Sequence, residues 1–305
     1  MSWLGIYLRG VLMGAADIVP GVSGGTMAFI TGIYDRLLGA IRAFDLEVLG
    51  MVVRGRIKDA WEHVDGTFLL TLLAGIATSI LSLARLISWL LEHHPIPLWA
   101  FFFGLILASA LVLLRQVGHW NPARVASLLA GAGAAAAVAL SPALGLDNAG
   151  LPAVFASGFL AICAMILPGI SGSFILVLLG MYAVVLTALK SLDLGFILVF
   201  AAGAACGLMC FSRLLHWLLH HYHAATLALL TGFLFGSLAI VWPWKEALGW
   251  VVGSHGEPRP VQQVPILPGQ YQQLTGEDPQ LWLCLLLAVV GGVAVWLIDT
   301  RWNRD

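Results

Sequence analysis

The sequence is poor in charged residues, and this shortage excludes an ordinary soluble protein. Only 10% of its 305 residues are Asp, Glu, Lys or Arg, whereas 60% are hydrophobic. Soluble domains carry roughly a quarter charged residues, and so few charges could not cover the surface of a soluble chain of this length. The apolar content also excludes intrinsic disorder. A mean hydropathy of +0.94 and apolar runs near 20 residues long indicate a polytopic membrane protein.

The sequence also lacks an excess of basic residues and has few cysteines. Its net charge of -1 argues against nucleic acid as a partner, because phosphate-backbone binding needs a basic face. The four cysteines lie in apolar runs without zinc-site spacing, and we interpret them as small buried side chains: Cys163, Cys206, Cys210 and Cys284. The first residues lack a basic n-region and carry Arg9 within their apolar stretch, so we expect them to belong to the mature fold.

What the sequence does contain is a series of apolar segments. The long ones predict six transmembrane helices, at residues 66–91, 96–117, 123–141, 194–220, 226–243 and 281–298. Shorter ones form two pairs, at 3–41 and 151–189, and each pair is interrupted by Pro-Gly. Such a break is typical of a re-entrant hairpin, with two full crossings as the alternative. We expect an interfacial amphipathic helix at 42–65 and an extramembrane loop at 244–280.

The two halves of the sequence repeat each other. Residues 20–24 read Pro-Gly-Val-Ser-Gly and residues 168–172 read Pro-Gly-Ile-Ser-Gly, an offset of 148 that also pairs Gly32 with Gly180 and Tyr34 with Tyr182. An offset of 128 relates later residues, and the matching pairs are Gly75 and Gly203, Arg85 and Arg213, Trp89 and Trp217, His93 and His221, Gly104 and Gly232, and Ser109 and Ser237. The offsets differ by 20 residues, which matches the surface helix found only in the first half. We therefore predict two copies of one unit, at residues 1–141 and 142–305.

The number of crossings predicts that the two copies have opposite orientations. Each copy contains a hairpin and three crossings, and an odd number inverts the second copy relative to the first. Ten basic residues would then face the cytoplasm with both termini, namely Arg9, Arg36, Arg42, Arg54, Arg56, Lys58, Arg115, Arg124, Arg301 and Arg304. The outside would hold three, Lys190, Lys245 and Arg259. The expected fold is an all-α polytopic membrane protein with two inverted-topology repeats, each a re-entrant or broken helix hairpin followed by three transmembrane helices.

The two Pro-Gly motifs are the first candidate binding site. Pro lacks an N–H and Gly permits positive φ, so a helix must end at each motif and restart after it. A restarted helix presents free N–H groups to an anion such as phosphate. The alternative is that Gly and Ser serve only close helix packing. The hairpin breaks are Pro20, Gly21, Pro168 and Gly169, and the candidate phosphate-binding residues are Ser23, Gly24, Gly25, Thr26, Ser171, Gly172 and Ser173.

Charged residues within membrane segments form a second group. Arg85 and Arg213 occupy equivalent positions on two long apolar helices, and their guanidinium groups could each hold a lipid phosphate near one leaflet. Snorkelling to the headgroups is the alternative. Asp17 could couple transport to protons or sodium, or could cap the restarted helix. We interpret His216 and His220 as a polar cap at a helix end rather than a metal site, because the first repeat has Ser88 and Glu92 there.

The motif of residues 17–26, Asp-Ile-Val-Pro-Gly-Val-Ser-Gly-Gly-Thr, together with Leu-Pro-Gly-Ile-Ser-Gly at 167–172, resembles a prokaryotic family of polyprenyl-phosphate (undecaprenyl-phosphate) transporters, formerly a membrane domain of unknown function. The resemblance covers nearly the whole chain. It implies that the chain flips the lipid carrier's phosphate headgroup from the outer to the inner leaflet of the bacterial cytoplasmic membrane, for reuse in envelope synthesis. Ser173 and Phe174 stand where the first motif has Gly25 and Thr26, so the hairpins need not bind equally.

Two other functions remain as alternatives, besides a passive scaffold that would transport nothing. One is an ion-coupled carrier of small anions with the same architecture. The other, a membrane enzyme acting on lipid phosphates, is disfavoured because the sequence lacks a phosphatase-like His set and an acidic cluster for metal. We therefore expect no enzyme activity, no metal and no cofactor. The expected partners are a polyprenyl-phosphate substrate and membrane lipids, and the sequence leaves open whether copies of the chain form a homo-oligomer.

Overall fold

The structure is a computed structural model that describes residues 2–18, 23–141, 150–252 and 258–302. Six of its helices are long and apolar enough to cross a membrane, which confirms the six predicted transmembrane helices: α6 (Gly66–His93), α7 (Pro95–Gln116), α8 (Pro122–Leu140), α12 (Leu194–His221), α13 (His223–Val241) and α15 (Leu281–Trp302). At a rise of 1.5 Å per residue, the 28 residues of α6 extend for about 42 Å, more than the bilayer's apolar core. Outward-facing apolar side chains such as Leu81 and Trp282 are more than four-fifths exposed, as a lipid-facing surface requires. The fold is that of a multi-pass membrane protein.

Each interrupted pair of apolar segments forms three helices, and each of these helices is shorter than a membrane crossing. The first pair is α1 (Trp3–Ile18), α2 (Gly24–Ile30) and α3 (Tyr34–Arg42), and the second is α9 (Leu151–Ile166), α10 (Gly172–Leu178) and α11 (Tyr182–Ser191). A bend of 107° separates α10 from α11. Gly32 (φ 71°) and Gly180 (φ 75°) have the left-handed backbone that ends α2 and α10, which explains why the repeat places glycine at both positions.

The two regions that the sequence predicts to lie outside the membrane have a different structure from the one expected. The predicted helix at 42–65 is two short helices, α4 (Leu46–Val53) and α5 (Ile57–His63), because Gly55 between them has φ 74° and ends the first. The predicted loop at 244–280 contains an antiparallel hairpin of β1 (Lys245–Val252) and β2 (Pro258–Pro265), followed by α14 (Pro268–Thr275). The described fold is therefore helical except for this hairpin. Trp242, at the end of α13, donates to the Ile266 carbonyl of this region at 2.8 Å, and Trp244 joins the two ends of the region by donating to the Pro279 carbonyl at 3.0 Å.

Equivalent helices of the two halves pack in equivalent pairs. α1 lies along α6 as α9 lies along α12, and α8 lies along α13 as α15 lies along α7. Glycines at matching positions allow these approaches: a Cβ on Gly75 would meet the Tyr7 carbonyl, and one on Gly203 would meet the Phe155 carbonyl. Small residues at helix contacts are the usual device for close packing within a membrane.

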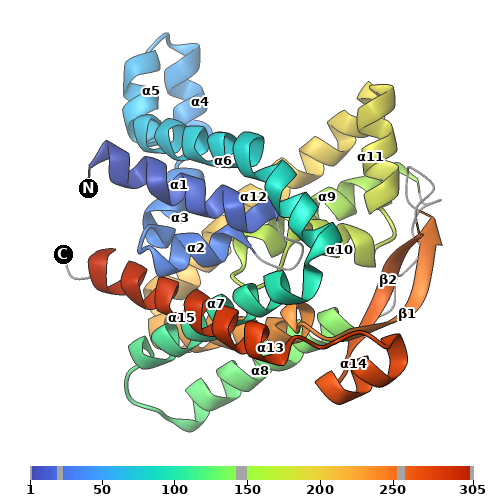
Figure 1. Ribbon diagram of the computed structural model, residues 1–305. Helices are drawn as coiled ribbons and strands as arrows, with labels where there is room; N and C mark the ends of the chain where they lie inside the picture. The colour runs from blue at the N-terminus through green and yellow to red at the C-terminus, as the bar shows by residue number, and fades with distance from the viewer. Residues whose placement is uncertain (1, 19–22, 142–149, 253–257, 303–305) are drawn as a thin grey trace.

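The two ends of the bundle differ (Figure 1). α1 begins and α15 ends on the side where α4 and α5 lie, at the left of the figure, whereas α11, α14 and the β1–β2 hairpin lie on the opposite side. We call these the surface-helix side and the hairpin side. The most deeply buried side chains include Phe68, Ile106 and Leu234 of the long helices α6, α7 and α13, together with Ile6 and Ile30 of the first hairpin.

Candidate functional site

The tip of the first hairpin is the turn between α1 and α2. Pro20 and Gly21 lie outside the described residues, so this hairpin break is not tested. Asp17, at the end of α1, accepts a hydrogen bond from the Gly24 N–H at 2.6 Å, and the Ser23 hydroxyl accepts one from the Gly25 N–H at 3.1 Å. The Thr26 N–H donates to the Ser23 carbonyl. The first N–H groups of α2, which the sequence predicts to be free for an anion, therefore already have partners within the chain.

The tip of the second hairpin is built differently. The sequence repeat puts Met165 where the first hairpin has Asp17, and no side chain of the described residues caps α10. The Ser171 and Ser173 hydroxyls hydrogen-bond each other at 2.8 Å. Gly169 has φ 87°, so the chain turns there as the Pro-Gly break predicts. Of the two restarted helices, α10 is the one without a side-chain cap.

The two tips contact each other directly. Ser23, whose side chain is fully buried, donates its hydroxyl to the Met165 carbonyl at 3.0 Å, and the Tyr34 hydroxyl donates to the Ile166 carbonyl at 2.9 Å. In the other direction, the Gly169 N–H donates to the buried Thr26 hydroxyl at 3.0 Å. A Cβ on Gly25 would collide with the Ile166 carbonyl, so the glycine is required for this approach.

The reason for these contacts is the interruption of the second hairpin. In a continuous helix the carbonyls of Met165 and Ile166 would accept from residues four positions later. The turn at Pro168 and Gly169 removes those partners, and unsatisfied polar groups are costly away from water. Side chains of the first hairpin replace them. The result is a largely buried polar centre, formed by residues 23–26 and 165–173, between the transmembrane helices; Met165 and Ser173 are its exposed members.

The two arginines lie apart from this centre. Arg213 donates to the Met209 carbonyl of its own helix and to the Phe44 carbonyl between α3 and α4, both at 3.1 Å, and its side chain is exposed. Arg85 is also exposed and makes no hydrogen bond or ion pair with any described residue. Neither guanidinium hydrogen-bonds a described residue of either tip, so the tips are brought together and the arginines are separate.

Sequence reasoning missed two polar residues that donate to backbone carbonyls of the hairpins. Tyr34 was used only as a marker of the repeat, although its hydroxyl joins the two hairpins. Arg9, assigned to the cytoplasmic side by the charge count, is only 5% exposed, and its Nε donates to the Thr31 carbonyl at the end of α2 at 3.0 Å. An arginine within an apolar segment is itself a signal of a buried role.

Comparisons with known proteins agree with the resemblance. A polyprenyl-phosphate transporter of Vibrio cholerae is 49% identical over 297 residues, which cover 97% of this chain and 96% of the relative. A polyprenyl-phosphate transporter of Staphylococcus aureus is 32% identical over 270 residues, 79% of this chain and 87% of the relative. No solved structure matches. The family profile described as undecaprenyl phosphate translocase-like matches residues 13–259, and the chain belongs to that family.

Proposed function

We propose that this chain is a carrier that flips polyprenyl phosphate across the bacterial cytoplasmic membrane and returns the lipid carrier to the inner leaflet for envelope synthesis. The names of the two relatives support the substrate. The observation that carries the proposal is the buried contact between the hairpin tips, Ser23 with Met165 and Thr26 with Gly169, among six membrane-spanning helices. Such a centre offers polar groups to a headgroup where lipid alone offers none.

The proposed architecture is a pair of inverted repeats, residues 1–141 and 142–305, with both termini in the cytoplasm. The equivalent helix pairs and the shared surface-helix side of the two chain ends support it. Transporters of this kind place the substrate where the repeats meet and alternate access between the two membrane faces. The long prenyl tail would stay in lipid while the headgroup passes through the centre.

The phosphate would be held at the two tips, with α10 as the stronger partner. Ser171, Gly172 and Ser173 stand at the uncapped start of α10. The hydroxyls of Ser23 and Thr26, with Gly24 and Gly25, would complete the site once the tips move apart. Arg85 and Arg213, each near one end of its helix, would receive the phosphate at opposite leaflets.

Asp17 would couple transport to a proton or sodium gradient. Its carboxylate accepts the hydrogen bond of the Gly24 N–H, which would otherwise be free to donate to a phosphate. Protonation or sodium binding at Asp17 would weaken this hydrogen bond and release the N–H to the substrate. Cation entry and phosphate binding would then favour each other.

The test uses the full chain in sealed vesicles that contain radiolabelled polyprenyl phosphate in both leaflets. A water-soluble phosphatase added outside cleaves only the outer-leaflet lipid unless the chain brings the rest outward. We expect nearly complete cleavage with the wild type and slow cleavage of the inner half with Ser23→Ala. Ser127→Ala is the matched control, because Ser127 is half-buried on α8 and its hydroxyl donates only to a carbonyl of its own helix.

Cleavage that stops at the outer half with the wild type, as in empty vesicles, would overturn the proposal. Uptake of radiolabelled inorganic phosphate by the same vesicles would indicate the small-anion carrier instead. Phosphate release without added phosphatase would indicate a lipid-phosphate enzyme. In cells depleted of the chain, the proposal predicts more polyprenyl phosphate exposed at the outer surface.

A further inference from the structure

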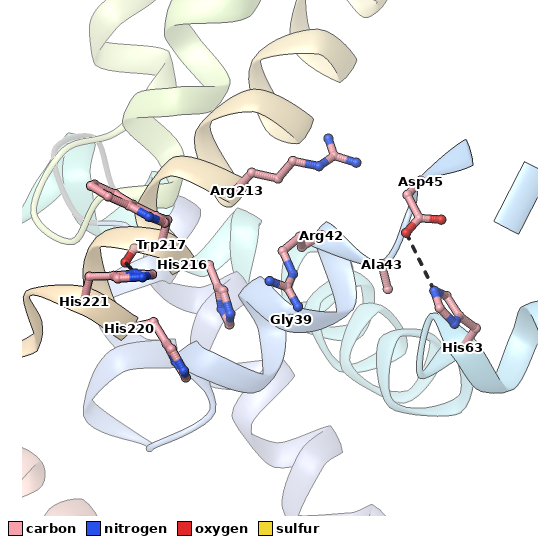
Figure 2. A pocket seen from close by; sticks show the side chains of 10 residues that line it. All are labelled: Gly39, Arg42, Ala43, Asp45, His63, Arg213, His216, Trp217, His220 and His221. Atoms are coloured by element: carbon pink, nitrogen blue, oxygen red, sulfur yellow. Dashed lines mark hydrogen bonds and ion pairs between the residues drawn. The ribbon is translucent and has the colours of Figure 1, made fainter. Parts of the chain in front are cut away.

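A basic pocket lies on the surface-helix side, away from the hairpin tips. Its volume is about 940 Å³, and it is lined by Gly39, Arg42, Ala43, Asp45, His63, Arg213, His216, Trp217, His220 and His221. In Figure 2 the side chains of α12 face the end of α3, and Asp45 and His63 stand at one edge. Residues far apart in the sequence thus bring two guanidinium groups and four imidazoles to one cavity.

Positive charge in this pocket is only partly compensated. Asp45 is the only acidic residue that lines it, and its carboxylate accepts the Glu47 and Val48 N–H groups that begin α4, at 2.9 and 3.1 Å. The hydrogen bond from the Val48 N–H is the main cause that lowers the pKa of Asp45. His63 Nε2 lies 3.9 Å from the same carboxylate. Among the lining residues, one carboxylate therefore faces two permanent positive charges, and it already serves a helix start and an imidazole. The Glu47 carboxylate lies within 4.8 Å of Asp45 and His63, which stand at the edge of the pocket.

Arg42 is the group most open to a ligand. It is exposed, and it makes no hydrogen bond or ion pair with any part of the chain that the structure describes. It lies within electrostatic range of His216, which Asp35 of α3 and His220 also influence. Arg213 uses Nη1 and Nη2 on backbone carbonyls, but a guanidinium has five N–H groups, so donors remain. The free fork of Arg42 and the remaining donors of Arg213 face one cavity, and together they match the oxygens of a phosphate monoester.

The surroundings of the pocket favour a lipid headgroup as the source of the phosphate. Trp217 lines the pocket and is 47% exposed, and the neighbouring α4 presents Leu49 and Val53, which are 58% and 79% exposed. Amphipathic helices with such faces lie in the membrane interface. A headgroup could therefore enter the pocket while its apolar tail remains in the bilayer.

The sequence repeat shows that the pocket belongs to one side only. At the equivalent positions of the first half, Arg85 and Trp89 correspond to Arg213 and Trp217. However, Ser88 and Glu92 stand where α12 has His216 and His220, and Lys190 stands where the first half has Arg42. The opposite end of the molecule thus replaces two imidazoles by a hydroxyl and a carboxylate.

From these observations we propose that the pocket between α3 and α12 binds the phosphate monoester of a prenyl lipid through Arg42 and Arg213. It is a second headgroup site, distinct from the hairpin tips, where the lipid is held at the surface-helix side. The assignment of a lipid source rests on the proposed function, whereas the anion site rests on the pocket itself.

The test measures binding to the full chain in nanodiscs of phosphatidylcholine, with farnesyl phosphate, inorganic phosphate and farnesol as probes. Loss of a charged hydrogen-bonding partner predicts a roughly 10- to 100-fold weaker affinity of Arg42→Gln for farnesyl phosphate. Arg42→Lys should be intermediate, because the charge stays but the fork is lost. Arg54→Gln is the matched control, since Arg54 is exposed at the end of α4 and does not line the pocket. Farnesol binding should not change in any variant.

Unchanged farnesyl phosphate affinity in both Arg42 variants would contradict phosphate binding in this pocket. Equal affinity of the wild type for inorganic phosphate and farnesyl phosphate would contradict the assignment of the ligand as a lipid. A thermal unfolding curve that overlays that of the wild type shows that Arg42→Gln is folded.

The vesicle assay separates this proposal from the proposed function. If Arg42→Gln loses binding while the wild type fails to flip lipid, the pocket stands and the flipping function fails. If the wild type flips lipid and Arg42→Gln binds like it, only the pocket fails.

Discussion

At the scale of single residues, side chains of the first hairpin form the hydrogen bonds that are missing where the second hairpin is interrupted. Thr26 accepts the Gly169 N–H and Ser23 donates to the Met165 carbonyl, so each hairpin lacks part of its hydrogen bonding without the other. This arrangement suits a moving part. When the tips separate, the same groups become free, and a phosphate could satisfy the N–H and hydroxyl donors among them.

Replacing Thr26 by Val tests the contact between the tips. Val has a similar shape but cannot accept, so the buried Gly169 N–H would lose its partner at a cost of about 1–3 kcal/mol. We expect a lower unfolding temperature in detergent and slower lipid flipping. Thr26→Ser retains the hydroxyl and should stay close to the wild type in both measurements. Equal stability of Thr26→Val and Thr26→Ser would contradict the importance of this hydrogen bond.

Two variants of Asp17 separate its capping role from its coupling role. Asp17→Asn retains an oxygen that can accept the Gly24 N–H, but it does not titrate. We expect Asp17→Asn to remain as stable as the wild type while flipping loses its response to an imposed pH or sodium gradient. Asp17→Ala should lose both the response and thermal stability. A full gradient response in Asp17→Asn would place the coupling elsewhere.

The sequence could predict where the chain breaks but not what satisfies the broken ends. Pro168 and Gly169 identify the interruption through their own backbone chemistry. Tyr34 lies 132 positions before the carbonyl that it contacts, and only tertiary packing brings the two together. The basic pocket was missed for the same reason. In the sequence, His216 and His220 indicate only a polar helix end. In the structure, Arg42 of another helix lies at the same pocket.

At the scale of elements, glycine positions determine which helices pack most closely. Gly75 lets α6 approach the Tyr7 carbonyl of α1, and Gly203 does the same for α12 at Phe155 of α9. The sequence repeat includes both glycines, and the structure gives the physical reason for the match. The six long helices were predictable because their apolar runs are long. The β1–β2 hairpin was not, because its proline, glutamine and glycine residues resemble those of an irregular loop.

Substituting alanine for two glycines tests this packing. In Gly75→Ala the new Cβ would overlap backbone atoms of α1, which cannot yield as a flexible side chain would. We expect a destabilisation of about 1–3 kcal/mol, typical of overpacking, observed as a lower unfolding temperature in detergent. Gly133→Ala is the matched control, because nothing lies within 4 Å of the Cβ that it would add on α8. Equal unfolding temperatures for the two variants would show that the α1–α6 approach tolerates a methyl group.

At the scale of the whole molecule, the two halves differ in how the last helix of each hairpin packs against a long helix. The first hairpin packs its α3 against α12, and Arg213 joins that helix to the Phe44 carbonyl. Within the described residues, the equivalent α11 does not pack against α6 in a comparable way, and Arg85 has no such partner. In the proposed inverted arrangement, the surface-helix side is therefore closed between hairpin and long helix, and the hairpin side is open.

If access alternates, the two hairpins should exchange these arrangements. Spin labels at Ala43 and Leu214 report the distance between the end of α3 and α12, and labels at the equivalent Ser191 and Leu86 report the distance between α11 and α6. The four native cysteines would first be replaced by serine or alanine. With polyprenyl phosphate added, we expect a second population in which the first distance is longer and the second is shorter. The matched positions make each pair the control for the other, because a general loosening would lengthen both distances. Distances that do not change, or that lengthen together, would contradict alternating access and leave the asymmetry of the two hairpins as a fixed feature of the fold.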